Sequence, residues 1–365
     1  MDVPQEGGRA SAGTSLAVYG LTHAIVDGVC AALAAHAVAG KVGTPYALWL
    51  WVVAYDTLAF GLQVPFGHLV DSLRALRAFA AAGCLLVGLA SLTCGLSMPV
   101  SLCVAGLGNA LFHAGGGAVS INATPHRATG PGLFVAPGWV GLTLGGLSAS
   151  HGGFSPYLFA MLPLLACLAL FVVGAPSTGD GRPPVRARDG RFVLALVLLL
   201  SAIAARSLLG LAENFPWKSD TALLLALACA VAGGKAAGGI LADRFGWTRV
   251  SVAALLAAAP LVSFGAMRPA WAITGMFLFQ MAMPVTLASV AALFPGRAGF
   301  AFGLASFALI AGAWPTFTAL KSPLGDHIFL FVLALLSASA VFGGLLALRR
   351  LLSLRDANEP VLTRL

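Results

Sequence analysis

A histidine and an aspartate stand four positions apart in the first long apolar run of the chain, as His23 and Asp27. Residues at this spacing share one face of a helix, so the imidazole and the carboxylate can meet there. Such a pair can take up and release a proton, because burial and a neighbouring charge alter the protonation of both groups. A structural hydrogen bond between helices is the alternative. Asp56, in the second apolar run, is a further candidate proton carrier, or else it neutralises Arg206 or Lys235.

Arg206 is a permanently charged residue inside a later apolar run. Its planar guanidinium matches a phosphonate, phosphate or carboxylate group, which favours a role in binding an anionic ligand. Two structural alternatives are that the side chain extends outward to the end of its helix, or that it pairs with Glu213, seven residues later.

Several uncharged side chains lie in other apolar runs and are candidates for lining the same ligand site. They are Gln63, Asn109, His113, Gln280 and the aromatic Trp139. Polar residues of this kind more often form hydrogen bonds between helices, and a tryptophan more often packs, so both interpretations stay open.

The composition requires a lipid environment for these residues. The 365-residue chain is 59% hydrophobic and only 9% charged, whereas soluble domains carry about 25% charged residues. Its apolar runs are mostly long enough to cross a hydrocarbon core of about 30 Å as helices, and they lack the alternation of barrel strands. A carboxylate at the centre of such a helix costs roughly 2.5–3.5 kcal/mol, so Asp27 is expected to face a water-filled cavity.

Twelve spans are predicted, which makes the fold an all-α membrane protein of twelve transmembrane helices in two similar six-helix bundles. The spans are 16–40, 46–70, 75–96, 100–122, 132–150, 154–174, 192–211, 219–242, 250–267, 271–293, 299–320 and 328–348. The domain organisation is an N-terminal segment 1–15, a first bundle 16–175, a linker 176–191 rich in arginine, proline and glycine, a second bundle 192–350 and a tail 351–365.

The distribution of lysine and arginine predicts the orientation. Fifteen of these residues lie near span ends on one side and four on the other, and the richer side is expected to be cytoplasmic. Both termini and the linker are therefore predicted in the cytoplasm. The first residues lack the pattern of a cleaved secretory signal, so a bacterial inner membrane fits best. Lys235 lies in a glycine-rich stretch, and we expect it to be structural, with its ammonium reaching the cytoplasmic interface.

A short motif occurs twice, 172 positions apart, which is close to half the chain. Each copy joins two apolar runs with Gly-x-x-x-Asp and nearby arginines, and an internal repeat at this distance predicts two similar halves. Glycine lets two helices approach closely, while aspartate can cap a helix end. The alternative is that both aspartates are solvated loop charges. The residues of this gating motif are Gly67, Asp71 and Arg74, and Gly239, Asp243, Arg244 and Arg249.

Six plus six helices, a basic central linker and this repeated motif resemble the major facilitator superfamily of transporters. The first copy departs from the superfamily pattern, because Ser72 replaces the usual arginine and Leu73-Arg74 replaces the following glycine. The resemblance implies alternating access, with a substrate site near the bilayer midplane at the interface between the two bundles.

A narrower resemblance is to the fosmidomycin-resistance branch of that superfamily. It rests on Thr22-His23-Ala-Ile-Val-Asp27, Leu62-Gln63-Val-Pro65-Phe-Gly67, Asn109-Ala-Leu-Phe112-His113 and Ala205-Arg206-Ser207. This resemblance implies proton-coupled export of a small, anionic organic compound or drug. An importer of small organic anions is the first rival, because the same residues would serve either direction.

Other classes of function are less favoured. The glycine-rich segments lack a nucleotide-binding loop, and the six cysteines form no CxxC pair and are expected to be small buried apolar residues. We therefore expect no cofactor, no bound metal and no nucleic acid, and a monomer whose partners are a small-molecule substrate, protons and lipid. A membrane-embedded enzyme or a transporter-like sensor is the remaining alternative. The scattered intramembrane charges argue against the enzyme.

Overall fold

The structure is a computed structural model that describes residues 11–40, 43–175, 190–318 and 324–358. The first set of helices, here the N-terminal set, comprises α1 (Ala12–Ala39), α2 (Pro45–Gly61), α3 (Gln63–Leu73), α4 (Leu76–Thr93), α5 (Met98–Ala123), α6 (Thr129–Ser150) and α7 (Pro156–Val173). The C-terminal set comprises α8 (Gly190–Ala212), η1 (Pro216–Ser219), α9 (Thr221–Phe245), α10 (Trp247–Phe264), α11 (Pro269–Gln280), α12 (Met283–Leu293), α13 (Ala298–Ala313), η2 (Trp314–Phe317) and α15 (His327–Asn358).

These elements make twelve candidate membrane spans within the described residues, each long and apolar enough to cross a bilayer. The predicted all-α class with twelve spans is thereby confirmed. The domain boundaries drawn at 16–175 and 192–350 stay predictions. The predicted linker falls largely on residues 176–189, which lie outside the described residues, as do parts of both terminal segments.

Two of the spans are interrupted at positions that the apolar pattern did not predict. One span breaks between α2 and α3 after Gly61, and another between α11 and α12 after Gln280. In each case a proline follows four residues later, as Pro65 and Pro284. Proline has no amide hydrogen to donate to the carbonyl four residues before it, so the helical ladder is interrupted there.

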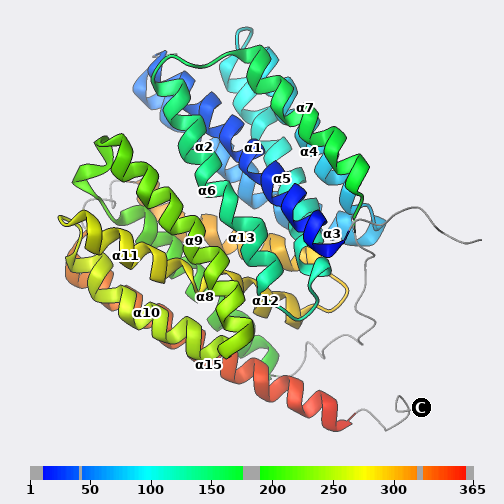
Figure 1. The fold of residues 1–365 in the computed structure, drawn as a ribbon, viewed down its shortest axis with the longest axis vertical. Coiled ribbons are helices and arrows are strands. Elements are labelled where there is room, and N and C mark those ends of the chain that lie inside the picture. Colours follow the sequence, from blue (N-terminus) through cyan, green and yellow to red (C-terminus); the bar gives the residue numbers. More distant parts are fainter. Residues whose placement is uncertain (1–10, 41–42, 176–189, 319–323, 359–365) are drawn as a thin grey trace, which may run out of the picture.

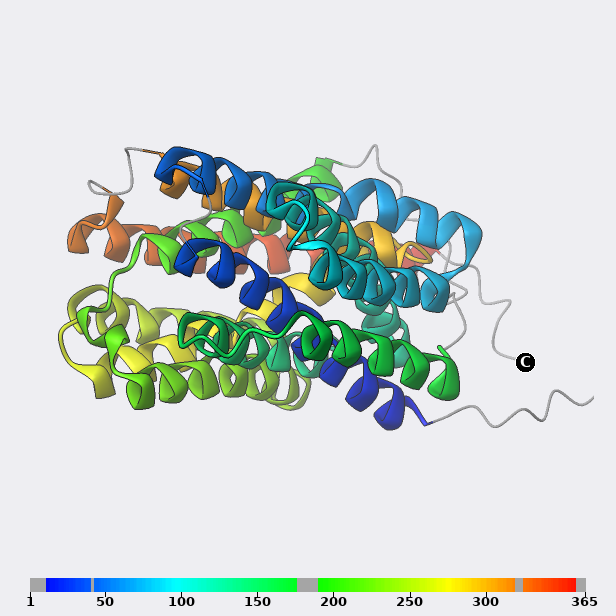
Figure 2. The same ribbon diagram turned by 90° about the horizontal axis from the view of Figure 1, so that it is seen from above.

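The two sets lie side by side and meet along α6 and α13 (Figure 1). Helix α6 of the N-terminal set packs on α9 of the C-terminal set, and α13 packs on α3. Most helices run lengthwise along the molecule when it is seen from above (Figure 2). Large apolar side chains such as Leu168, Val172 and Phe342 are exposed on the outside, as expected for a surface that faces lipid.

Glycines on α6 let it approach α1 more closely than ordinary side chains would allow. A Cβ added at Gly141 would collide with the carbonyl group of Ala24, and one added at Gly145 would collide with that of Gly28. Close approach through small residues is the usual way that membrane helices gain packing contacts. This contact fixes the position of His23 and Asp27 along the axis of α6.

All six cysteines are free, and four of them are buried. Cys103 is partly exposed and Cys229 is exposed, so the expectation that all six are buried was wrong for these two. Cys229 lies in the apolar span α9, and a thiol is apolar enough to tolerate a surface that faces lipid.

Candidate functional site

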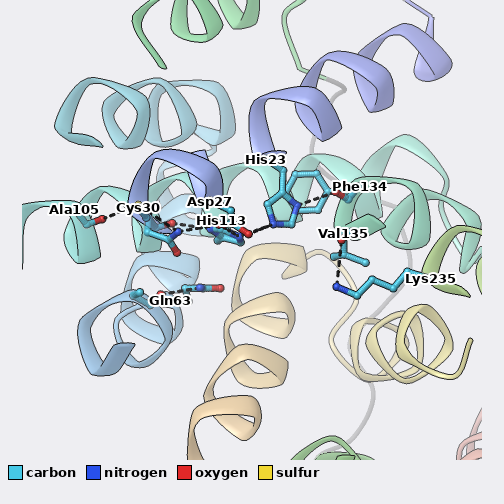
Figure 3. A network of polar contacts seen from close by, with 11 residues as sticks. His23, Asp27, Cys30, Gln63, Ala105, His113, Phe134, Val135 and Lys235 are labelled. Atoms are coloured by element: carbon cyan, nitrogen blue, oxygen red, sulfur yellow. Dashed lines mark hydrogen bonds and ion pairs between the residues drawn. The ribbon is translucent and has the colours of Figure 1, made fainter. Parts of the chain in front are cut away.

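His23 and Asp27 of α1 are in contact inside the N-terminal set. His23 Nε2 lies 3.0 Å from Asp27 Oδ2, and both side chains are buried. Two residues of α5 complete the group: Asn109 donates its Nδ2 hydrogen to Asp27 Oδ1 at 3.0 Å, and His113 Nε2 lies 3.6 Å from the same oxygen. Figure 3 shows His23, Asp27 and His113 converging from the two helices. We call His23, Asp27, Asn109 and His113 the polar cluster.

The main chain determines which ring nitrogens of the polar cluster carry hydrogen. His23 Nδ1 lies 2.8 Å from the carbonyl oxygen of Phe134, and His113 Nδ1 lies 2.9 Å from that of Asn109. A carbonyl oxygen can only accept, so each Nδ1 must donate. A neutral imidazole has one donor nitrogen, which leaves both Nε2 atoms as acceptors if both rings are neutral.

The two Nε2 atoms nevertheless lie 2.9 Å apart. That is a hydrogen-bond distance, and two lone pairs cannot form such a bond without a hydrogen between them. The arrangement therefore needs one proton more than two neutral imidazoles and a carboxylate supply. With that proton, one ring is an imidazolium whose charge the Asp27 carboxylate balances, so the cluster is neutral as a whole.

Helix α6 forms the wall on which the polar cluster rests. The ring of His23 stacks on that of Phe134, with centroids 4.7 Å apart. A Cβ added at Gly138 would collide with His23 Nε2 and would lie 2.8 Å from Asp27 Oδ2. Only glycine fits at this position. Pro137, one residue earlier, lies inside the helix and removes one backbone donor there.

The same residues are the metal-ligating group that the described residues offer. Ligand atoms of His23, Asp27 and His113 lie within 4.8 Å of one another. Two imidazoles and a carboxylate are a common ligand set for divalent transition metals. A proton shared between the two Nε2 atoms accounts for their short contact, so this geometry can be satisfied without a metal ion.

The other predicted polar residues lie apart from one another. Gln63 is fully buried and donates to the carbonyl oxygen of Ala59 in its own chain segment at 2.7 Å, while its Oε1 has no partner among the described residues. Asp56 and Gln280 are partly buried. The proposed pairing of Asp56 with Arg206 or Lys235 is absent from the described part of the chain.

Arg206 is buried in the C-terminal set, with 6% of its surface exposed, so it does not extend outward. Its Nη1 donates weakly to Thr286 Oγ1 at 3.4 Å, its guanidinium lies 5.4 Å from the centre of the Phe279 ring, and its Nε has no acceptor among the described residues. It forms no ion pair with Glu213, whose own Oε2 also lacks a described partner. The alternative in which these two residues pair was therefore wrong.

Lys235 is the residue whose place the sequence analysis misjudged. Instead of reaching the interface, its side chain is buried, with 8% exposed. Its Nζ donates to the carbonyl oxygen of Val135 at 3.4 Å and lies 5.8 Å from the Trp139 ring centre. Figure 3 shows Lys235 reaching from the C-terminal set toward α6, beside His23. The sequence indicated this burial through the position of Lys235, which lies ten residues before the basic end of α9 and therefore well inside the span.

The two motif aspartates cap helices that belong to the opposite set. Asp71 accepts from the backbone amides of Gly299 and Phe300 at 2.9 and 2.8 Å, at the start of α13. Asp243 accepts from the amides of Ala128 and Thr129, both at 2.9 Å, at the start of α6. Neither is a solvated loop charge. A carboxylate at a helix N-terminus satisfies free amides and opposes the positive end of the helix dipole.

The motif glycines allow these caps to form. A Cβ at Gly67 would collide with the Gly299 carbonyl, and one at Gly239 would lie 2.5 Å from the Ala128 carbonyl oxygen. The motif arginines are exposed: Arg244 stacks beside Phe245, with its guanidinium 5.2 Å from the ring centre, and Arg74 ends α3 in a left-handed conformation.

A cavity of about 710 Å³ lies between the two sets at this motif end of the molecule. Its lining includes Arg127, Arg249 and Arg349, together with Trp247, and within the described part of the chain it contains no aspartate or glutamate. We call it the basic vestibule. A cleft lined by one sign of charge concentrates ligands of the opposite sign.

The twelve spans in two laterally packed sets form the major facilitator fold, which solved transporters of low sequence identity share. Similar solved structures include the human organic anion transporter MFSD10 (TETRAN), with a TM-score of 0.70, 14% identity, and coverage of 90% of this chain and 99% of that chain. A variant of the E. coli fucose:proton symporter FucP has a TM-score of 0.61 and 12% identity, with coverage of 93% of this chain and 98% of that chain. FucP in the outward conformation has a TM-score of 0.60 and 13% identity, with coverage of 92% of this chain and 99% of that chain. No family model and no curated protein matches the sequence.

Proposed function

We propose that this protein is a proton-coupled secondary transporter of a small organic anion, working by alternating access between the two sets of helices. The observation that carries the proposal is the buried contact between the two Nε2 atoms of the polar cluster, which needs a proton. The fold supports a transporter, and one neighbour is by name a proton symporter and another an organic anion transporter. No enzyme chemistry is proposed.

In this proposal His23, Asp27 and His113 exchange the coupling proton. Without it, two lone pairs and a carboxylate face one another in a buried place, and they repel. Loss of the proton therefore favours separation of α1 from α5, the two helices that carry the three groups. Asp56 is partly buried and forms no ion pair among the described residues, so it is the second candidate.

Arg206 is proposed to bind the anionic group of the substrate, because its guanidinium is buried and its Nε lacks an acceptor among the described residues. Trp139, Gln63, Asn109, His113 and Gln280 remain proposed contributors to the same central region. Asp71 and Asp243 are proposed to hold the motif end closed through their helix caps, and Arg74, Arg244 and Arg249 to act at its surface.

Two directions of transport follow from different arguments. Export is the direction that the resemblance to the fosmidomycin-resistance branch implies. Uptake is the second candidate, and it is the direction expected when the anion at Arg206 acts electrostatically on the proton site. An anion bound near a proton site strengthens proton binding, and by reciprocity the proton strengthens anion binding. Two ligands that favour each other travel together, which is symport.

The remaining proposals concern place and assembly. The excess of arginine at the motif end supports a cytoplasmic location for that end and for both termini. We further propose that the protein lies in a bacterial inner membrane and functions as a monomer.

The test is uptake of a fosmidomycin-like phosphonate into proteoliposomes under an imposed pH gradient of either sign. We expect the gradient to drive accumulation in the wild type, Asp27→Asn to abolish this drive while sparing exchange, and Asp56→Asn to retain it. Arg206→Ala should weaken uptake and exchange alike. A wild type that ignores both gradient and phosphonate, or an Asp27→Asn variant that keeps its drive, would overturn the proposal.

A further inference from the structure

We infer that Lys235 and Arg206 together form a two-cation site for a substrate with two negative charges, such as a phosphonate dianion or a dicarboxylate. The inference deepens the proposed function, on which it rests, by naming the charge of the substrate and by adding a second binding residue.

Both cations are buried without a neutralising partner. In the described part of the chain neither has a carboxylate oxygen within ion-pair distance. Each makes one long hydrogen bond of 3.4 Å, Arg206 to Thr286 and Lys235 to Val135. A guanidinium has five N–H donors and an ammonium three, so most of this donor capacity is uncommitted.

The two cations belong to segments that meet at one residue of α6. A Cβ added at Gly132 would lie 2.8 Å from the carbonyl oxygen of Lys235 and 3.2 Å from Pro284, which stands two residues before Thr286, the hydrogen-bond partner of Arg206. Two like charges in a medium of low polarity repel, and each is already costly to bury. A single negative charge offsets one of them, whereas a ligand with two negative charges offsets both.

The polar cluster does not supply the missing negative charge. In its protonated form the Asp27 carboxylate balances an imidazolium, so the cluster is neutral and the two cations remain unbalanced. Asp56 and Glu213, the other acidic residues considered in the interior, form no ion pair with either cation among the described residues.

Aromatic rings complete the walls of the site from both sets. Trp139 of α6 faces the Lys235 ammonium, and Phe279 of α11 faces the Arg206 guanidinium. These contacts stabilise each cation modestly and leave its hydrogens available. An organic substrate with an apolar body therefore finds apolar surface beside both charges.

The position of Lys235 is held by close packing of α9. A Cβ at Gly234 would collide with the Phe277 carbonyl, and one at Gly238 with that of Met281, both on the α11 side. On the other side Gly239 packs on Ala128, at the start of α6. Because α9 is wedged between these helices, the ammonium is preorganised at the contact between the two sets.

The experiment compares two ligands of matched shape on the purified full-length protein in nanodiscs. Phenylphosphonate, above its second ionisation, carries two charges, and benzenesulfonate carries one. We expect wild type to bind the phosphonate at least about tenfold more tightly. Lys235→Met, which keeps the apolar stem, should reduce this preference to about twofold or less. Arg206→Met should weaken binding of both ligands, and Arg268→Met, at an exposed cation that also stacks on a tryptophan, should change neither.

Thermal unfolding without ligand provides the second measurement. Since Lys235 has no charged partner, Lys235→Met should unfold at the same temperature as wild type or higher, and a clear decrease would show a structural role and overturn the inference. Equal binding of the two ligands by wild type, or an unchanged preference in Lys235→Met, would overturn it as well. These outcomes are independent of the pH-gradient test. If the ligands bind as expected but a pH gradient does not drive uptake, only the proposed proton coupling is contradicted. If a pH gradient drives uptake but the doubly charged ligand is not preferred, only this inference is contradicted.

Discussion

The two sets of helices treat their buried polar groups in opposite ways. The N-terminal set gathers His23, Asp27, Asn109 and His113 into one network in which each member has a partner. The C-terminal set leaves Arg206, Glu213 and Lys235 without ion pairs, and Arg206 Nε and Glu213 Oε2 have no partners among the described residues. The two sets therefore differ in whether their buried polar groups find partners within the protein.

This contrast separates the binding of a proton from the binding of a substrate. A satisfied network can gain or lose one hydrogen with small movements, because its members already point at one another. Buried cations with free donors are instead stabilised by a ligand that brings both charge and acceptors. Lys235 of the C-terminal set donates to the Val135 carbonyl of α6, and the neighbouring Phe134 carbonyl accepts from His23, so Lys235 lies at the contact between the two sets.

A substitution in α6 that displaces the polar cluster should have the largest effect on uptake. Gly138→Ala places a methyl group where His23 Nε2 lies, so the cluster cannot keep its geometry. We expect proton-driven uptake to fall by about a hundredfold, in line with the cost of misplacing a reacting group. Gly146→Ala is the matched control on the same helix, because a Cβ there meets nothing within 4 Å. Equal uptake by both variants would refute the role of the wall.

Removing the two helix caps should show that the copies of the motif differ in strength. Asp243 accepts four hydrogen bonds, from Ala128, Thr129 (twice) and Trp247, whereas Asp71 accepts two. With hydrogen bonds to charged groups worth about 1.5–3 kcal/mol each and not additive, we expect Asp243→Ala to destabilise by roughly 4 kcal/mol and Asp71→Ala by roughly 2. Thermal unfolding of both variants in one detergent makes the comparison. Equal losses would contradict it.

Glu213, the buried carboxylate of the C-terminal set, should make the stability of the protein depend on pH. Burial raises the pKa of Glu213 to about 7, although Lys218 acts in the opposite direction. The folded protein therefore holds this proton more tightly than the unfolded chain, so the stabilisation is present below about pH 4 and is lost as pH rises through about 7. Glu213→Gln stays neutral, so we expect it to match wild type in acid and to exceed it near pH 8 by at most about 3 kcal/mol. If the difference in unfolding temperature between wild type and Glu213→Gln is the same at all pH values, the raised pKa of Glu213 is contradicted.

The smallest predicted effect concerns one turn that the two copies share. Arg74 and Gly246 occupy the same place, three residues after the motif aspartate, and both have a positive φ, of 54° and 100°. A non-glycine residue in the left-handed region costs about 1 kcal/mol. We expect Arg74→Gly to raise stability by up to about that amount, and Gly246→Ala to lower it. A decrease for Arg74→Gly would mean that the arginine side chain contributes more than the strain costs.

Much of the architecture was predictable from the order of residues alone. Twelve apolar runs, each long enough for a bilayer, can form only helices there, because no water is present to satisfy an unpaired backbone. The repeat of Gly-x-x-x-Asp predicted two similar halves, and the four-residue spacing placed His23 and Asp27 on one face. Span length and four-residue spacing are local properties that a single run of sequence contains, and the repeat is found by comparing two short segments of the same sequence.

The composition of the site depended on contacts between distant residues. His113 and Asn109 were expected to line a cavity, yet they lie on Asp27, 82 or more residues away. Lys235 was expected at the interface, yet it is buried against Val135, 100 residues away. Neither could be read from spacing, because rotation of a helix about its axis decides which neighbour a side chain meets.

The sequence by itself therefore determined that the chain spans a membrane twelve times as helices and which residues are charged within it. Only the tertiary structure decided that two imidazoles and a carboxylate lie in contact, that Lys235 is buried against α6, and that each motif aspartate caps a helix of the opposite set. The physical reason is that hydrophobicity and backbone hydrogen bonding act within each span, whereas the pairing of buried polar groups depends on helix packing, which the glycines at Gly138, Gly141 and Gly239 allow to be close.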